Sequence, residues 1–239
     1  MEHQKYESII QCLQTYSWAD LDTVESGLCD QFPDVPPLTL RSILCLQYQR
    51  HIKTTFHSEH SDHNKALTYA RVMEAVEDEE EEVGEVVRLT RESGFSPALT
   101  ARMVLHSHQG GDKVNIMMKD TTLIENGRLA LEVMMANIKD DSYGHVAESI
   151  KHSIGEEHEQ KLKDILTQRN IPFTDEHVLR SLGYDKTPDI KLEVPISVDG
   201  CIINWIESKA LFGDPESHHG YLRDQLWSYL NRLWWIFRH

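Results

Sequence analysis

Two runs of strand-forming residues joined by a two-residue turn limit the possible folds of this chain more than any other feature. The runs span residues 189–198 and 201–209, and Asp199-Gly200 joins them. An Asp-Gly pair between two such runs is a strong signal for a β-hairpin, because both residues tolerate the positive φ that a tight turn requires. The sequence therefore predicts an antiparallel pair of strands in the last third of the chain.

The first 140 residues instead have the spacing of amphipathic helices. Apolar residues recur three and four positions apart, as in the segment 6–13. Ser96-Pro97 predicts the start of a helix, with Ser96 as the N-cap and proline at the first helical position. Short helices joined by tight turns can form helix-turn-helix units that bind DNA, but most small helical bundles show the same pattern.

These patterns divide the chain into two expected domains. We expect a helical domain over residues 1–140. Over residues 141–239 we expect a mixed β-sheet flanked by helices, so that the whole chain is of the α+β class. The segment 171–173 should be extended, and a helix should follow the loop at 212–215.

Acidic side chains dominate the composition, with 39 Asp and Glu against 24 Lys and Arg and a net charge of −15. Part of the excess lies in an acidic run at 74–85, which we expect to form a solvated helix end or loop. A protein that binds nucleic acid usually has a basic face. Contact with phosphates must therefore come from a local basic groove or a bound metal ion. No apolar run approaches the roughly 20 residues of a membrane span, and we expect no membrane partner.

The ends of the two predicted strands carry the residue types that metal-dependent phosphodiester hydrolysis needs. Asp189 opens the first strand, and Glu207 and Lys209 close the second. Glu207 and Lys209 are two residues apart, so both project from one face. Asp189, Glu207 and the Ser208 carbonyl could bind Mg²⁺ or Mn²⁺, and Lys209 could orient or deprotonate water. A surface ion pair would also explain Glu207 and Lys209.

The register of the hairpin tests this hypothesis. Strict pairing about Asp199-Gly200 sets Asp189 opposite Ala210, on the other face from Glu207. One extra residue in the first strand would bring Asp189 to the same face as Glu207. Pro195 cannot donate to the ladder, and such positions are often bulges, so we predict a bulge or break near Pro195.

Pro188-Asp189, 17 intervening residues and Glu207-Ser208-Lys209 resemble the PD-(D/E)xK motif of restriction-endonuclease-like folds. The resemblance implies a nuclease with Asp189, Glu207 and Lys209 as catalytic residues. It also implies an acidic residue near the metal on the preceding helix, and Glu157 is our choice.

Further along the chain, Gln225 and Tyr229 resemble the Gln-x-x-x-Tyr motif of the RecB and lambda-exonuclease branch of these folds. There the glutamine helps to position the nucleophile or the metal. The resemblance implies a catalytic role for Gln225 and contact with nucleic acid for Tyr229. His218 and His219 are candidate phosphate donors, although a histidine pair in a loop often has no such role.

Longer segments resemble the codanin-interacting nuclease family, at 47–53, 96–99, 152–155, 183–189, 205–210 and 217–219. This resemblance implies a nuclease that acts on nucleic acid, binds codanin, occurs in nucleus and cytoplasm and is linked to erythroid cell differentiation. Residues 233–239 depart from the family, so we expect the nuclease-like domain to lack its last strands. A missing strand would expose a sheet edge and could abolish activity in this chain.

Two alternatives use the same fold without catalysis. A non-catalytic adaptor would keep the nuclease fold and bind codanin. A DNA-binding module would act through the helical half, where Arg50 and Lys53 belong to its most basic patch.

Overall fold

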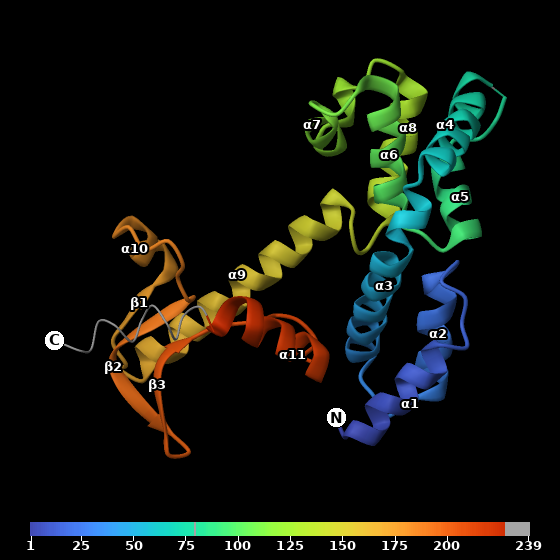
Figure 1. Cartoon of the computed structure of the whole chain (residues 1–239). Coiled ribbons are helices and arrows are strands. Elements are labelled where there is room, and N and C mark those ends of the chain that lie inside the picture. The colour runs from blue at the N-terminus through green and yellow to red at the C-terminus, as the bar shows by residue number, and fades with distance from the viewer. Residues whose placement is uncertain (79, 228–239) are drawn as a thin grey trace. The chain divides into compact units, whose positions relative to one another are not determined.

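The computed structural model describes residues 1–78 and 80–227 (Figure 1). The chain forms two compact units. The helical unit is Met1–Ile150, and the sheet unit begins at Lys151. Within the described residues, all strands belong to the sheet unit. The α+β class expected from the sequence is therefore confirmed.

The helical unit is built around helix α6. This helix packs against α4, α5, α7 and α8. Their apolar faces bury residues such as Val86, Ala101, Leu105, Leu129 and Val133 in one core. The helices are α1 (His3–Leu13), α2 (Leu21–Gln31), α3 (Pro37–Glu59), α4 (Asp62–Glu77), α5 (Glu85–Ser93), α6 (Pro97–Gln109), α7 (Val114–Lys119) and α8 (Gly127–Lys139), with a short 3₁₀ turn η1 (Thr121–Leu123).

Side-chain caps determine where several of these helices begin. The Ser96 hydroxyl accepts a hydrogen bond from the Leu99 N–H at 3.1 Å, with Pro97 at the first helical position, as predicted. Asn126 caps α8 in the same way. Helix α4 ends at Glu77, inside the acidic run, and α5 starts at Glu85. The described part of the run between them is a loop, which confirms that expectation.

A buried carboxylate from another helix fixes the start of α5. Glu132 of α8 is 3% exposed. Its two oxygens accept hydrogen bonds from the N–H groups of Gly84, Glu85 and Val86, at 2.6, 3.1 and 3.0 Å. The first N–H groups of a helix have no partner within the helix, so Glu132 supplies the acceptor that they lack.

The sheet unit contains three antiparallel strands in the order β1-β2-β3, together with most of α9. Leu166 of α9, Ile190 and Leu192 form its buried core. The elements are α9 (His145–Gln168), β1 (Phe173–Asp175), α10 (Glu176–Ser181), β2 (Ile190–Val198), β3 (Cys201–Ile206), α11 (Pro215–Tyr221) and the π-helical turn η2 (Leu222–Leu226). The expected mixed sheet was wrong for the described strands, because each connection returns the chain in the opposite direction and leaves only antiparallel pairs.

The predicted hairpin turn and bulge are both confirmed. Asp199 and Gly200 have φ of 50° and 80°, as the tight turn requires. Next to the turn, Ile196 pairs with Ile203, but beyond Pro195 the register shifts and Lys191 pairs with Trp205. Four residues of β2, 192–195, thus stand opposite the single Asn204 of β3. The bulge is larger than predicted, with three extra residues instead of one. Side chains alternate between the two faces of a strand, so an insertion of three residues has the same effect as an insertion of one. Asp189 therefore still moves to the face that carries Glu207.

Candidate functional site

The bulge in β2 brings Asp189 to Glu207 at the far end of the hairpin. The Asp189 N–H donates to Glu207 Oε2 at 3.4 Å, and the Ser208 N–H donates to Asp189 Oδ2 at 2.6 Å. Lys209 Nζ donates to Glu207 Oε1 at 2.7 Å. The structure therefore brings together Asp189, Glu207, Ser208 and Lys209, which we call the carboxylate–lysine cluster.

Residues after the sheet complete this cluster. Gln225 lies in the π-helical turn η2, and its Nε2 donates to Glu207 Oε1 at 2.6 Å. The ring of Tyr221 lies beside Lys209, with Nζ 5.6 Å from its centroid, within the range of a cation–π contact. Sequence reasoning missed Tyr221. Its position four residues before Gln225, on the same side of a helix, was the available signal.

Burial and like charge act together on Asp189. Burial, together with the nearby carboxylates of Glu207 and Glu159, raises the pKa of its carboxyl to about 6, against the Ser208 N–H and Lys209, which lower it. The Glu207 side chain is only 6% exposed. The cluster thus concentrates more negative charge in a half-buried site than Lys209 neutralises. A bound cation would relieve this excess.

The acid of α9 whose charge acts on Asp189 is Glu159 and not Glu157, the residue chosen from the sequence. Glu157 pairs with Lys161 at 2.6 Å on an exposed face, and the hydrogen bond from Lys161 lowers the pKa of Glu157. Positions two apart on a helix differ by about 200° in direction, so Glu157 and Glu159 face opposite ways. Leu162 and Leu166 pack against the sheet, and Glu159 precedes them by three and seven residues on the same stripe. That spacing could have identified it.

The residues expected to contact nucleic acid lie on different elements of the structure. His218 and His219 are exposed on α11, where His219 Nδ1 donates to the Pro215 carbonyl at 2.6 Å. Arg50 and Lys53 lie on α3 of the helical unit. Tyr229 lies outside the described residues.

The donor set of the cluster fits one class of metal ion better than another. Among residues 1–78 and 80–227, no group of three or more His, Cys, Asp or Glu side chains is arranged to hold a metal. Zinc sites usually need three or four such ligands. Magnesium typically takes one or two carboxylates and completes its shell with water and phosphate oxygens. Asp189 and Glu207 are therefore suited to magnesium or manganese.

Comparisons with known proteins show the family of this chain. The family model described as "Protein of unknown function TPD sequence-motif" matches residues 125–234, and Thr187-Pro188-Asp189 lies in that range. Proteins named CDAN1-interacting nuclease 1 from Homo sapiens and Bos taurus are each 40% identical to the chain, over 96% of this chain and 83% of the relative. The Xenopus laevis protein of that name is 44% identical, over 86% and 70%. The chain belongs to the CDAN1-interacting nuclease 1 family. No solved structure matches it.

In the part of the chain that the structure describes, every helix is too short or too polar to cross a bilayer.

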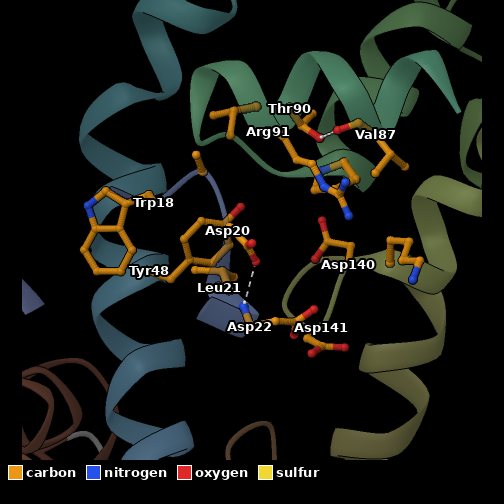
Figure 2. Close-up of a pocket in the computed structure, with 14 residues that line it drawn as sticks. Trp18, Asp20, Leu21, Asp22, Tyr48, Val87, Thr90, Arg91, Asp140 and Asp141 are labelled. Carbon is orange, nitrogen blue, oxygen red and sulfur yellow. Dashed lines mark hydrogen bonds between the residues drawn. The ribbon is translucent and has the colours of Figure 1, made fainter. Parts of the chain in front are cut away.

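A second group of carboxylates surrounds a cavity of about 100 Å³ in the helical unit (Figure 2). Trp18 and Tyr48 line it, with ring centroids 6.1 Å apart, and Asp20 and Asp140 face the same space. Asp20 caps α2, and the hydrogen bond from the Thr23 hydroxyl lowers the pKa of its carboxyl.

Asp140 in this cavity is also a structural residue. It is 3% exposed. Its oxygens accept hydrogen bonds from the N–H groups of Ala98, Ser142 and Tyr143, at 3.0, 2.8 and 2.6 Å, and from the Ser96 hydroxyl. Because backbone groups already occupy these oxygens, the cavity is a poorer candidate for catalysis than the carboxylate–lysine cluster.

Proposed function

We propose that this chain is a metal-dependent nuclease of the PD-(D/E)xK type that hydrolyses phosphodiester bonds of nucleic acid. The observation that carries the proposal is the contact of Asp189, Glu207 and Lys209 across the β2 bulge. The relatives' printed name, which includes the word nuclease, supports the same class of reaction.

Mg²⁺ or Mn²⁺ would be held by the carboxylates of Asp189 and Glu207, with the Ser208 carbonyl as a further donor, and the charge of Glu159 would add to the attraction for the ion. When bound, such an ion supplies Lewis-acid chemistry at a phosphoryl oxygen and lowers the pKa of a bound water. The excess of carboxylates over lysine at Asp189 supports this assignment.

The remaining groups of the cluster position Lys209 and Glu207. The Lys209 amino group orients or deprotonates the attacking water and offsets charge on the phosphate. Glu207 Oε1 fixes this amino group at 2.7 Å and itself accepts the Gln225 amide at 2.6 Å. Gln225 therefore restrains the carboxylate, and the Tyr221 ring contacts the lysine cation.

The partner follows from the relatives' name. We propose that the chain also binds codanin, the CDAN1 of that name. On the family resemblance of the sequence, we also propose that it acts in nucleus and cytoplasm during erythroid differentiation. Co-purification of the full chain with codanin tests the first part, and imaging of the tagged chain in erythroid cells tests its location.

The decisive experiment compares the wild-type chain with Lys209→Ala on single- and double-stranded DNA and RNA, with Mg²⁺ or Mn²⁺. We expect cleavage that Lys209→Ala lowers by about 100-fold or more, the usual contribution of a proton-transfer group. Glu159→Gln and Glu157→Gln form a matched pair on one helix. Glu159→Gln should weaken the metal dependence about tenfold, as removal of a group near a metal often does, and Glu157→Gln should leave it unchanged.

Cleavage that survives both Lys209→Ala and Asp189→Asn would place the activity elsewhere or in a contaminant. A chain that binds codanin but cuts none of these substrates with either metal would favour the non-catalytic adaptor.

A further inference from the structure

A cavity in the helical unit, apart from both carboxylate groups described above, carries basic side chains. Its volume is about 270 Å³, and Arg102 of α6, Lys119 of α7 and His145 at the start of α9 line it. Asn115 and Glu148 also contribute to the lining. From this arrangement we propose that the helical unit holds a phosphate-binding pocket, which binds a phosphate group of a polynucleotide strand.

Buried polar contacts fix the walls of this pocket. Asn137 of α8 is 5% exposed. Its amide donates to the Met118 carbonyl at 2.9 Å, and its Oδ1 accepts the His145 N–H at 3.4 Å. One side chain thereby ties the end of α7 to the start of α9. The pocket is preformed, so little ordering entropy opposes binding.

Gly144 permits the close approach that this arrangement needs. A Cβ atom at this position would lie 2.4 Å from the Asn137 carbonyl oxygen and 2.8 Å from that of Asp140. Since real side chains do not make such contacts, the turn between α8 and α9 requires glycine. The position of His145 against α8 therefore depends on the backbone and not on a mobile loop.

The charges of the pocket are not neutralised internally. Among the described residues, neither Arg102 nor Lys119 forms an ion pair, and Arg102 Nη1 donates instead to the neutral Asn115 amide. This bond holds the guanidinium and uses only part of its five N–H groups. The start of α9 adds about half a positive charge through the helix dipole. Glu148, exposed in the first turn of α9, is the acid that faces these cations.

A phosphate group matches this set of donors. Arg, Lys and His side chains around one space favour a compact anion with several acceptor oxygens. A chain with a net charge of −15 repels polyanions in general, so a local basic pocket is where a strand could make contact. The pocket lies outside the proposed catalytic cluster, and only its assignment to a polynucleotide rests on the proposed nuclease function.

Binding is measured with the full chain carrying Asp189→Asn, so that the strand is not cut. One arm follows the anisotropy of a labelled single-stranded oligonucleotide, and a second titrates inorganic phosphate by calorimetry. Arg102→Gln combined with Lys119→Gln should lower affinity for the oligonucleotide about tenfold or more, since charged hydrogen bonds contribute at least that much. The dependence of log affinity on log salt should flatten by roughly 0.7 for each phosphate that the variant no longer neutralises.

Glu148→Gln should change the affinity for the oligonucleotide in the opposite direction. Removing the opposing acid should raise affinity about threefold or more, a modest electrostatic gain. Lys65→Gln, at a half-exposed lysine of the same unit outside the pocket, should change little. Thermal unfolding of each variant shows whether the helical unit remains intact, as expected for side chains at the surface.

The pocket is disproved if the double variant binds both probes as tightly as its parent, or if Glu148→Gln weakens binding. Variant-dependent binding of inorganic phosphate without the oligonucleotide keeps the pocket but makes free phosphate its ligand. Failure of the proposed nuclease function would be seen separately, as absent cleavage by the wild-type cluster while the pocket still binds.

Discussion

In the helical unit, Glu132 and Asp140 are buried carboxylates whose oxygens accept backbone N–H groups where helices begin. In the sheet unit, Asp189 and Glu207 are also partly or largely buried, and each accepts one backbone N–H, but their neighbours include each other, Glu159 and one lysine. Helix N–H groups carry partial positive charge and compensate a buried carboxylate. A neighbouring carboxylate instead repels the charge of a buried carboxylate and destabilises its ionised form.

This contrast teaches that burial alone does not mark a functional acid. A carboxylate whose oxygens are occupied by backbone donors stabilises the fold, whereas one that is desolvated beside other acids is destabilised until a cation binds. The first kind should control stability and the second activity. The following predictions can break or sharpen that distinction.

The same substitution in the two units should have opposite consequences. Asp189→Asn should lower nuclease activity by about 100-fold or more, because it removes a proposed metal ligand. The midpoint of urea unfolding should not fall. Asp140→Asn should lower that midpoint and leave the activity of the folded fraction unchanged. If Asp189→Asn unfolds the sheet unit, or if Asp140→Asn abolishes cleavage in folded protein, the distinction between the two units fails.

Truncation of Glu132 should produce the next largest effect, on stability alone. Glu132→Ala leaves the N–H groups of Gly84, Glu85 and Val86 without their acceptor. We expect a loss of about 3 kcal/mol or more in the free energy of unfolding, since each buried unsatisfied donor costs about 1–3 kcal/mol. Glu132→Gln keeps one acceptor oxygen, so its free energy of unfolding should lie between those of the wild type and Glu132→Ala. Equal stability of wild type and Glu132→Ala in urea titrations would contradict this assignment.

The pH dependence of stability should differ in sign between Asp189 and Asp20. The Asp189 carboxyl has a pKa of about 6 in the folded chain, above its ordinary value of 3.8. The folded state then binds the proton more tightly than the unfolded state, so this group adds stability as pH falls from about 6 toward 4. The pKa of Asp20 is lowered, so its contribution is present at neutral pH and is lost on acidification.

Metal-free thermal unfolding between pH 4 and 7.5 measures both effects. Asp189→Asn should exceed the wild type in stability at pH 7 and approach it near pH 4, whereas Asp20→Asn should be less stable at pH 7. If the melting temperatures of Asp189→Asn and the wild type change with pH in parallel, Asp189 does not titrate between pH 4 and 7.5.

The smallest expected effect concerns Tyr221. Tyr221→Ala removes the ring beside Lys209 and should lower activity by about two- to fivefold, since an exposed cation–π contact contributes about 0.5–1 kcal/mol. Tyr221→Phe keeps the ring and should retain most of the activity. An equal loss with phenylalanine and with alanine would assign the role to the hydroxyl instead.

Local signals in the sequence predicted much of the site. Asp199-Gly200 determined the hairpin, because few other pairs adopt positive φ at two successive positions. Pro195 indicated where the ladder must fail. The two-residue spacing of Glu207 and Lys209 placed both on one face, and the bulge then allowed Asp189 to join them.

Other features depend on contacts between distant residues. The sequence located the bulge but not its three-residue size, which depends on how β1 and β3 both pair with β2. Glu157 and Glu159 are equally acidic, and only the packing of α9 on the sheet shows which faces Asp189. Asp140 and Asp189 are likewise the same residue type, with nothing local to distinguish a cap from a site.

The sequence by itself therefore determined the elements and the residue types available for chemistry, since turn geometry and helical or strand spacing act over a few neighbouring positions. The tertiary structure alone decided which carboxylates meet several backbone donors and which lie beside another carboxylate. The physical reason is that burial and electrostatic energy depend on distances in space, between side chains that are far apart along the chain.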